Sequence, residues 1–274
     1  MGTEMLNPRI HYDGMVFYGD NGINVSALFG IDPEQYLTMH QRLADIGLRV
    51  RLPDPAGQVD FVLYCHNLIN AGADVTNIIR EYNVGQRGDG TDFVHALSLT
   101  KLFYHYYMAG RDVSVCRTLG DLSSPDLIID GLPCELKVRI DQTQKRMEPY
   151  RHLLFDGKQD EYMDILFNQI RSRKHDLETA LLRARDGFEQ GDCVFLDISS
   201  HFHSWNYHRI RSLLKKEGIH GVSESPLAPI SGSCILFSPD NAWDRNNVGF
   251  NPRAYWGYLP LVLPPARRVV PESP

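Results

Sequence analysis

Two strand-forming runs joined by Asp130-Gly131 constrain the fold of this chain more than any other feature of its sequence. The runs lie within residues 124–139, and Asp-Gly between such runs is the strongest short-range signal for a two-residue hairpin turn. Counting outward from the turn places Ile129 opposite Leu132 and, three steps further, Asp126 opposite Glu135. The sequence therefore predicts a β-hairpin in which two carboxylates are direct neighbours across the strands.

The predicted hairpin has two chemically different faces, because side chains alternate along a strand with period two. One face is wholly apolar and the other carries charge. The apolar face comprises Leu127, Ile129, Leu132, Cys134, Leu136 and Val138, and the charged face comprises Asp126, Ile128, Pro133, Glu135, Lys137 and Arg139. Like charges directly opposed across strands destabilise the pair. A divalent cation with a preference for hard oxygen ligands, Mg²⁺ or Mn²⁺, would offset this repulsion.

This arrangement resembles the PD-(D/E)xK nuclease superfamily, also called the restriction-endonuclease-like fold. Pro125-Asp126 matches the first half of the motif, and Glu135-Leu136-Lys137 matches the second half. The resemblance implies that Asp126 and Glu135 bind metal and that the carbonyl of Leu136 adds a ligand. It implies that Lys137 orients or activates the attacking water, or stabilises the transition state. The alternative is a solvated hairpin face with a Glu-to-Lys pair.

The order of the predicted elements agrees with that resemblance. We expect an α/β, restriction-endonuclease-like αβββαβ core with a mixed sheet flanked by helices. Its elements in chain order are a helix at 91–109, strands at 112–118, 125–129 and 133–139, a helix at 160–187 and a strand at 192–199. A further helix is expected at 204–217 and a further strand at 233–238.

We expect three parts along the chain. Residues 1–84 form a mostly helical region of unknown role, with short strands at 1–30 and helices at 33–46 and 58–82. Residues 85–251 form the nuclease-like domain, and 252–274 form a tail rich in proline and aromatic residues that packs onto the body.

Candidates for a third metal ligand are scarce, because the helix from Phe93 to Gly110 contains no Asp or Glu. Asp92 in its first turn is the candidate ligand, with dipole complementation as the alternative explanation of that acid. His95 would line the site, one turn along on the same side. On the second long helix, the resemblance implies that Gln169 faces the site, with a surface glutamine as the alternative. Candidate phosphate contacts are Arg139, Arg171, Arg173 and Lys174.

The composition of the chain bears on which molecules it can bind. The formal net charge of -6 argues against a broadly basic nucleic-acid coat, but not against local basic clusters. The five cysteines form no Cys-x-x-Cys pair, and no apolar run is long enough to span a membrane. We therefore expect a cytoplasmic protein that acts on nucleic acid and does not contact a membrane. Whether the chain forms a homodimer is left open.

The expected function is that of a Mg²⁺- or Mn²⁺-dependent endonuclease, with DNA favoured over RNA. One alternative is an inactive nucleic-acid-binding or structural module of the same fold. Another is a toxin nuclease directed at RNA or tRNA.

Overall fold

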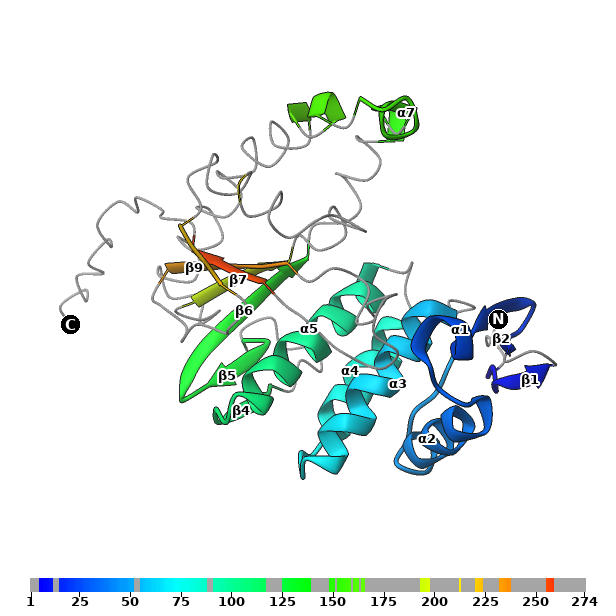
Figure 1. Cartoon of the computed structure of the whole chain (residues 1–274). Coiled ribbons are helices and arrows are strands. Elements are labelled where there is room, and N and C mark those ends of the chain that lie inside the picture. Colours follow the sequence, from blue (N-terminus) through cyan, green and yellow to red (C-terminus); the bar gives the residue numbers. More distant parts are fainter. Residues whose placement is uncertain are drawn as a thin grey trace.

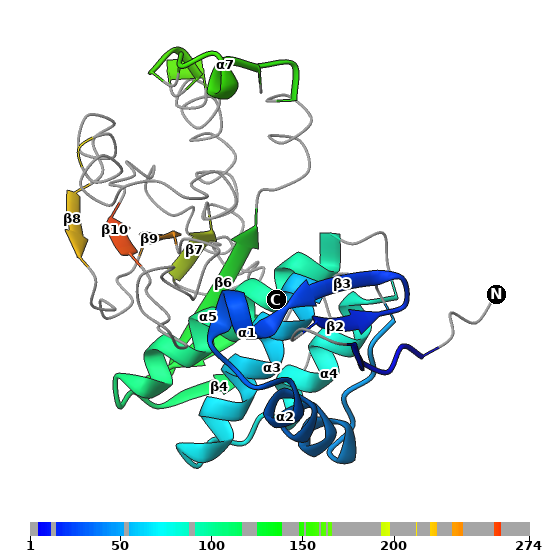
Figure 2. The same ribbon diagram turned by 45° about the vertical axis from the view of Figure 1, so that its right-hand side comes forward.

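The computed structural model of this chain gives its secondary structure and packing over most of the N-terminal half and over the strands of the C-terminal half. Figures 1 and 2 show it from two sides. The described residues are 5–11, 15–51, 55–87, 91–116, 125–138, 148–150, 152–158, 160–162, 164–165, 193–197, 212, 220–223, 232–237 and 255–258.

The chain begins with a small antiparallel sheet. Its strands β1 (Arg9–His11), β2 (Met15–Tyr18) and β3 (Asn21–Asn24) are ordered β1-β2-β3. The short helix α1 (Val25–Phe29) follows at once, because the side chain of Asn24 accepts a hydrogen bond from the backbone N–H of Ala27 at 2.8 Å. This confirms the expected short strands in residues 1–30 and adds a helix that the sequence analysis did not foresee.

The helix expected after Asp32 is confirmed. Helix α2 (Pro33–Asp45) starts where Asp32 Oδ1 accepts hydrogen bonds from the first-turn backbone N–H groups, and proline suits the first helical position. The helix expected at 58–82 is two helices, α3 (Pro55–Asn70) and α4 (Thr76–Gly85). Gly72, with φ of +91°, lies in the turn between them.

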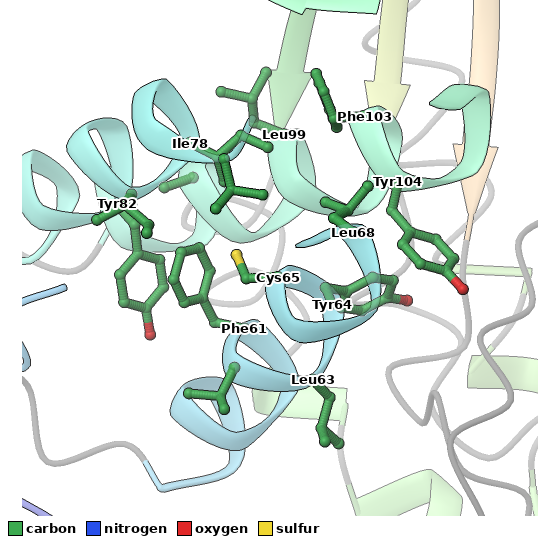
Figure 3. Close-up of a cluster of buried hydrophobic side chains, with 14 of the residues drawn as sticks. Phe61, Leu63, Tyr64, Cys65, Leu68, Ile78, Tyr82, Leu99, Phe103 and Tyr104 are labelled. Carbon is green, nitrogen blue, oxygen red and sulfur yellow. The ribbon is translucent and has the colours of Figure 1, made fainter. Parts of the chain in front are cut away.

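The hydrophobic core joins the N-terminal helices to the second half of the described chain. Helix α3 is buried on nearly every side, with Phe61 stacked on Tyr82 of α4 at 3.5 Å between ring centroids. Tyr64 meets Tyr104 edge-on at 5.0 Å (Figure 3). One continuous cluster of buried residues runs from Val16 to Phe195.

Helix α5 (Thr91–Met108) lies between α3 and α4 on one side and the main sheet on the other (Figures 1 and 2). Tyr106 of α5 packs against Phe195 of the sheet at 5.8 Å between ring centroids. The helix ends before Gly110, whose φ of +78° is a conformation that favours glycine. Helix α5 therefore supports the sheet that carries the predicted hairpin.

Within the described residues, seven strands form one mixed sheet in the order β4-β5-β6-β7-β9-β10-β8. Strands β4 to β6 are antiparallel, β6, β7 and β9 are parallel, and β10 is antiparallel to both β9 and β8. The strands are β4 (Val113–Val115), β5 (Leu127–Ile129), β6 (Leu132–Val138), β7 (Cys193–Asp197), β8 (His220–Ser223), β9 (Gly232–Phe237) and β10 (Tyr255–Tyr258).

The expected α/β class with a mixed sheet is thus confirmed, as are the strands expected near 112–118, 192–199 and 233–238. Strands β8 and β10 were not foreseen, and β10 falls in the segment interpreted as a tail. Two short helical pieces, η2 (Glu148–Tyr150) and α7 (His152–Phe155), follow β6. The helices expected at 160–187 and 204–217 lie mostly outside the described residues. The domain boundaries at 84 and 251 stay predictions.

Candidate metal and active site

The hairpin turn forms as the sequence predicts. Asp130 and Gly131 have φ values of +50° and +79°, and a type I′ turn requires positive φ at both central residues. Asp130 is held in place by Arg111 Nη1, at 2.7 Å from its Oδ2, and by the backbone N–H of Asp112, at 3.1 Å from its Oδ1. The register is Ile129 with Leu132, Ile128 with Pro133, and Leu127 with Cys134, which confirms the first three pairs of the prediction. The fourth pair, Asp126 with Glu135, lies beyond these paired residues and stays a prediction.

The apolar face of the hairpin faces the protein core. The side chains of Leu127, Ile129, Cys134 and Leu136 are all essentially without solvent exposure. This burial fixes the register, because a slip by one residue would turn the buried side chains of the shifted strand to the opposite face. The alternating pattern was therefore a reliable guide to the hairpin.

The two acids of the motif lie one step beyond Leu127 and Cys134, the last residues that pair between β5 and β6. Glu135 lies within β6, where it pairs with Val194 of β7. Asp126 precedes β5, and its carbonyl accepts a hydrogen bond from the backbone N–H of Cys116 at 3.1 Å. Both acids are shielded from water: the Asp126 side chain is 12% exposed, and Glu135 is 8% exposed. Burial of two carboxylates is costly without compensating partners.

Pro125 limits how far the backbone ladder between the two strands of the hairpin can extend. In an antiparallel hairpin every second residue pair exchanges backbone hydrogen bonds, and the pair that closes a two-residue turn is one of them. Counting outward from Ile129, the next hydrogen-bonded positions are Leu127 with Cys134 and then Pro125 with Leu136. Because proline has no N–H, it cannot donate to the carbonyl of Leu136. The backbone ladder therefore ends at this point.

Beyond the paired residues of the hairpin, side chains contact the backbone groups of Leu136. The backbone N–H of Leu136 donates to Asp126 Oδ2 at 2.7 Å, which orients that carboxylate. The carbonyl oxygen of Leu136 lies 3.3 Å from His95 Nε2, which lies 3.6 Å from the same Asp126 Oδ2. One ring nitrogen from α5 thus faces two of the oxygens that the sequence analysis named as metal ligands.

His95 lies in an environment that favours positive charge. Burial alone would lower the pKa of His95, but the hydrogen bond and charge of Asp126, the carbonyl of Leu136 and the charge of Glu135 together raise it. The His95 side chain is 34% exposed, so the site is open to solvent on this side. The expectation that His95 lines the site agrees with these distances.

Cys116, whose backbone N–H donates to the carbonyl of Asp126, carries a thiol that is not activated as a nucleophile. Burial, followed by the negative charge of Asp126, raises the pKa of the Cys116 thiol. Because the thiolate is the reactive form of cysteine, a raised pKa keeps this group unreactive at neutral pH.

Several residues predicted for the site have side chains outside the described residues, so their positions relative to Asp126 and His95 are not given. Lys137 belongs to β6, where its backbone pairs with Leu196, and Asp92 lies in the first turn of α5, but both side chains lie outside the described set. Arg139, Gln169, Arg171, Arg173 and Lys174 lie wholly outside it. The sequence analysis missed the role of Pro125, although one further step of the register count would have revealed it.

The donor atoms fit a hard divalent cation in their chemistry. Two carboxylates and one backbone carbonyl are oxygen ligands of the kind that Mg²⁺ and Mn²⁺ take, with water and substrate phosphate as the usual remaining ligands. Among the side chains that the structure describes, no group of three or more His, Cys, Asp or Glu residues is arranged to hold a metal ion. The backbone carbonyl of Leu136 is thus an essential part of any site here.

Comparison with known proteins gives no family assignment. No family model matches the chain, and no curated protein or solved structure matches it significantly. Among the described helices, none is both long and apolar enough to cross a membrane.

Proposed function

We propose that this chain is a metal-dependent nuclease of the PD-(D/E)xK kind that hydrolyses phosphodiester bonds, with DNA favoured over RNA. One observation carries the proposal. Asp126 Oδ2 accepts a hydrogen bond from the backbone N–H of Leu136 at 2.7 Å, next to Pro125, where the backbone pairing of the hairpin ends. A solvated hairpin face would leave its acids exposed, whereas Asp126 and Glu135 are 12% and 8% exposed. Carboxylates so arranged are typical of a functional site.

The proposed reaction assigns a separate task to each residue of the motif. Asp126 and Glu135 would hold the cation, and the carbonyl of Leu136 would contribute a third oxygen. When bound, the metal supplies polarisation of the scissile phosphate and a lowered pKa for its water. Lys137 would stabilise the negative charge that develops on the phosphate or position the attacking water.

The order of the described elements supports the same proposal. Helix α5 is followed by the antiparallel strands β4, β5 and β6, and β7 then lies parallel to β6. A parallel neighbour requires a crossover connection, which residues 139–192 provide. The resemblance predicts a helix in that connection.

The test is a nuclease panel of supercoiled and linear DNA, single-stranded DNA and tRNA, with Mg²⁺, with Mn²⁺ and with EDTA. We expect cleavage that needs the metal and falls by at least roughly 100-fold in Lys137→Ala. Lys158→Ala is the matched control, because Lys158 is exposed and lies outside the hairpin.

The outcomes separate the proposal from its alternatives. Metal-independent binding of nucleic acid without cleavage would indicate an inactive module, and cleavage of tRNA alone would indicate an RNA-directed enzyme. The proposal fails if no substrate is cut with either metal and Asp126→Ala leaves metal binding unchanged.

A further inference from the structure

Three arginines that precede α5 form a surface feature that we call the arginine strip: Arg49, Arg51 and Arg87. Burial alternates along the segment that carries the first two. Leu48 and Val50 are each 3% exposed, whereas Arg49 is exposed and Arg51 is half-buried. Arg87 is exposed just beyond the end of α4. The two buried residues anchor the segment and leave its arginines on the outer side.

Two side-chain amides hold this segment against the C-terminal end of α4. Asn83 accepts a hydrogen bond from the backbone N–H of Arg49 at 2.7 Å and donates to the carbonyl of Gly47 at 2.8 Å. Gln86 accepts from the backbone N–H of Arg51 and donates to the carbonyl of Arg49, both at 2.7 Å. These bonds place Arg51 beside Gln86, the neighbour of Arg87 in the chain, and they use none of the guanidinium groups.

The arginine strip is not neutralised by carboxylates. Among the residues that the structure describes, none of its three guanidinium groups forms an ion pair. Arg49 Nη1 donates to the carbonyl oxygens of Ala44 and Leu48, at 3.3 and 2.9 Å, and these acceptors carry no net charge. The chain has 34 acidic and 28 basic residues, so unpaired arginines gathered in one place depart from its average charge. Such a local excess of positive charge attracts an anionic partner.

The arginine strip lies near the end of α5 that carries the candidate site. Helix α4 packs along α5 (Figures 1 and 2). The rings of Tyr82, near the end of α4, and Phe93, near the start of α5, lie 5.3 Å apart between centroids. Phe93 precedes His95 by two residues, and His95 Nε2 lies 3.6 Å from Asp126 Oδ2. A long anion bound at the site can therefore extend towards the strip.

Guanidinium groups suit a phosphate backbone. Each presents a planar set of N–H donors that can hold two phosphate oxygens at once, and each stays charged at neutral pH. Contacts to phosphate oxygens position a nucleic acid without reading its sequence. The strip thus has the chemistry that a nucleic acid needs beside a site of phosphodiester hydrolysis.

We propose that the arginine strip binds the phosphate backbone of the nucleic-acid substrate on one side of the scissile phosphate. This inference rests on the proposed nuclease function and gives a role to the region before α5. The strip contributes affinity and orientation, and it takes no part in the chemistry at Asp126. Loss of the strip should therefore raise KM and leave kcat nearly unchanged.

The test is fluorescence anisotropy of labelled duplex DNA, single-stranded DNA and RNA with the full chain in EDTA, where metal-dependent cleavage does not occur. Each phosphate contact that is lost lowers the slope of log K against log salt by about 0.9 for duplex DNA. The double variant Arg51→Gln, Arg87→Gln should lower this slope by about 1.8, and the affinity by roughly tenfold or more near about 0.1 M salt. Arg49 is kept, because its guanidinium group also binds the end of α2.

Two controls separate phosphate binding from a general effect of charge or stability. Arg42→Gln removes the same charge from an exposed arginine that donates to Asn70, the last residue of α3, and it should keep the wild-type slope. The double substitution of Arg51 and Arg87 by lysine retains both charges and should also keep the slope. Urea unfolding midpoints verify that each variant is folded.

Three results would overturn the inference. They are an unchanged slope in the glutamine double variant, an equal fall of the slope in Arg42→Gln, and no binding of any nucleic acid at about 50 mM salt, whether or not anionic lipid vesicles bind. The first two leave the proposed nuclease function intact, because cleavage is measured separately. Conversely, binding that depends on the strip in a chain that cuts no nucleic acid would support the strip and refute the nuclease.

Discussion

Replacing Asp126 with alanine is expected to destabilise the hairpin, whereas replacing it with asparagine is not. The alanine variant leaves the backbone N–H of Leu136 without the side-chain acceptor that it has in the wild-type chain. A hydrogen bond to a charged acceptor contributes about 1.5–3 kcal/mol. Relief of repulsion between Asp126 and Glu135 returns up to about 1 kcal/mol. The alanine variant should therefore lose about 0.5–3 kcal/mol in the free energy of unfolding.

The asparagine variant keeps a side-chain oxygen at the same position and removes the same repulsion. Its stability should lie within about 0.5 kcal/mol of the wild-type chain, although it lacks the charge that a cation needs. Both variants should thus lose metal binding, and only one should lose stability.

The assay combines urea unfolding with hydrogen exchange at the Leu136 amide. In a thermal melt, a loss of about 0.5–3 kcal/mol corresponds to a fall in Tm of roughly 1–12 °C for a chain of this size. Exchange at Leu136 should accelerate in the alanine variant and stay protected in the asparagine variant. Equal destabilisation by the two substitutions, or unchanged protection of Leu136 in the alanine variant, would refute the reasoning.

Three further predictions address the backbone ladder of the hairpin, the pH dependence of stability and the packing of the hydrophobic core. Pro125→Ala supplies an N–H opposite Leu136 and should weaken Mn²⁺ binding by drawing the carbonyl into the ladder; a protected amide at 125 with unchanged affinity would contradict this. Burial lowers the pKa of His40 to about 4, below the value of about 6.5 expected in the unfolded chain, so stability should fall by about 3 kcal/mol as pH drops from 6.5 to 4. In His40→Leu, the fall in the urea midpoint between pH 6.5 and pH 4 should be smaller than in the wild-type chain. An equal fall would contradict the assignment of this pH dependence to His40. Phe61→Ala removes the ring stacked on Tyr82 and should cost about 3–5 kcal/mol in urea unfolding, with a cost below about 1 kcal/mol contradicting the packing.

Local chemistry determined what the sequence could predict. The Asp130-Gly131 turn, the register of the hairpin and the helix expected at 33–46 depend on residues close together in the chain, and all three were confirmed. The burial of the apolar face followed from simple alternation. These features are predictable because neighbouring residues alone decide them.

Features that depend on distant residues were missed. Helix α3 is buried on nearly every side, so it lacks the one-sided periodicity that would have separated it from α4 at Gly72. Strand β10 was interpreted as part of a tail, because its four residues include Gly257 and show no alternating pattern. The contact of His95 with Leu136 joins residues 41 positions apart, and it exists only because α5 packs against the sheet.

The position of β10 has a consequence for folding of the chain. Strand β10 lies between β9 and β8 in the sheet, yet it follows both of them in the sequence (Figure 2). Until β10 has joined the sheet, β9 therefore presents an unpaired edge, and β8 has no described neighbour in the sheet. Unpaired strand edges are templates for association with other chains. A folding intermediate without Tyr255–Tyr258 in place is thus open to association at this edge, and that short strand completes the sheet.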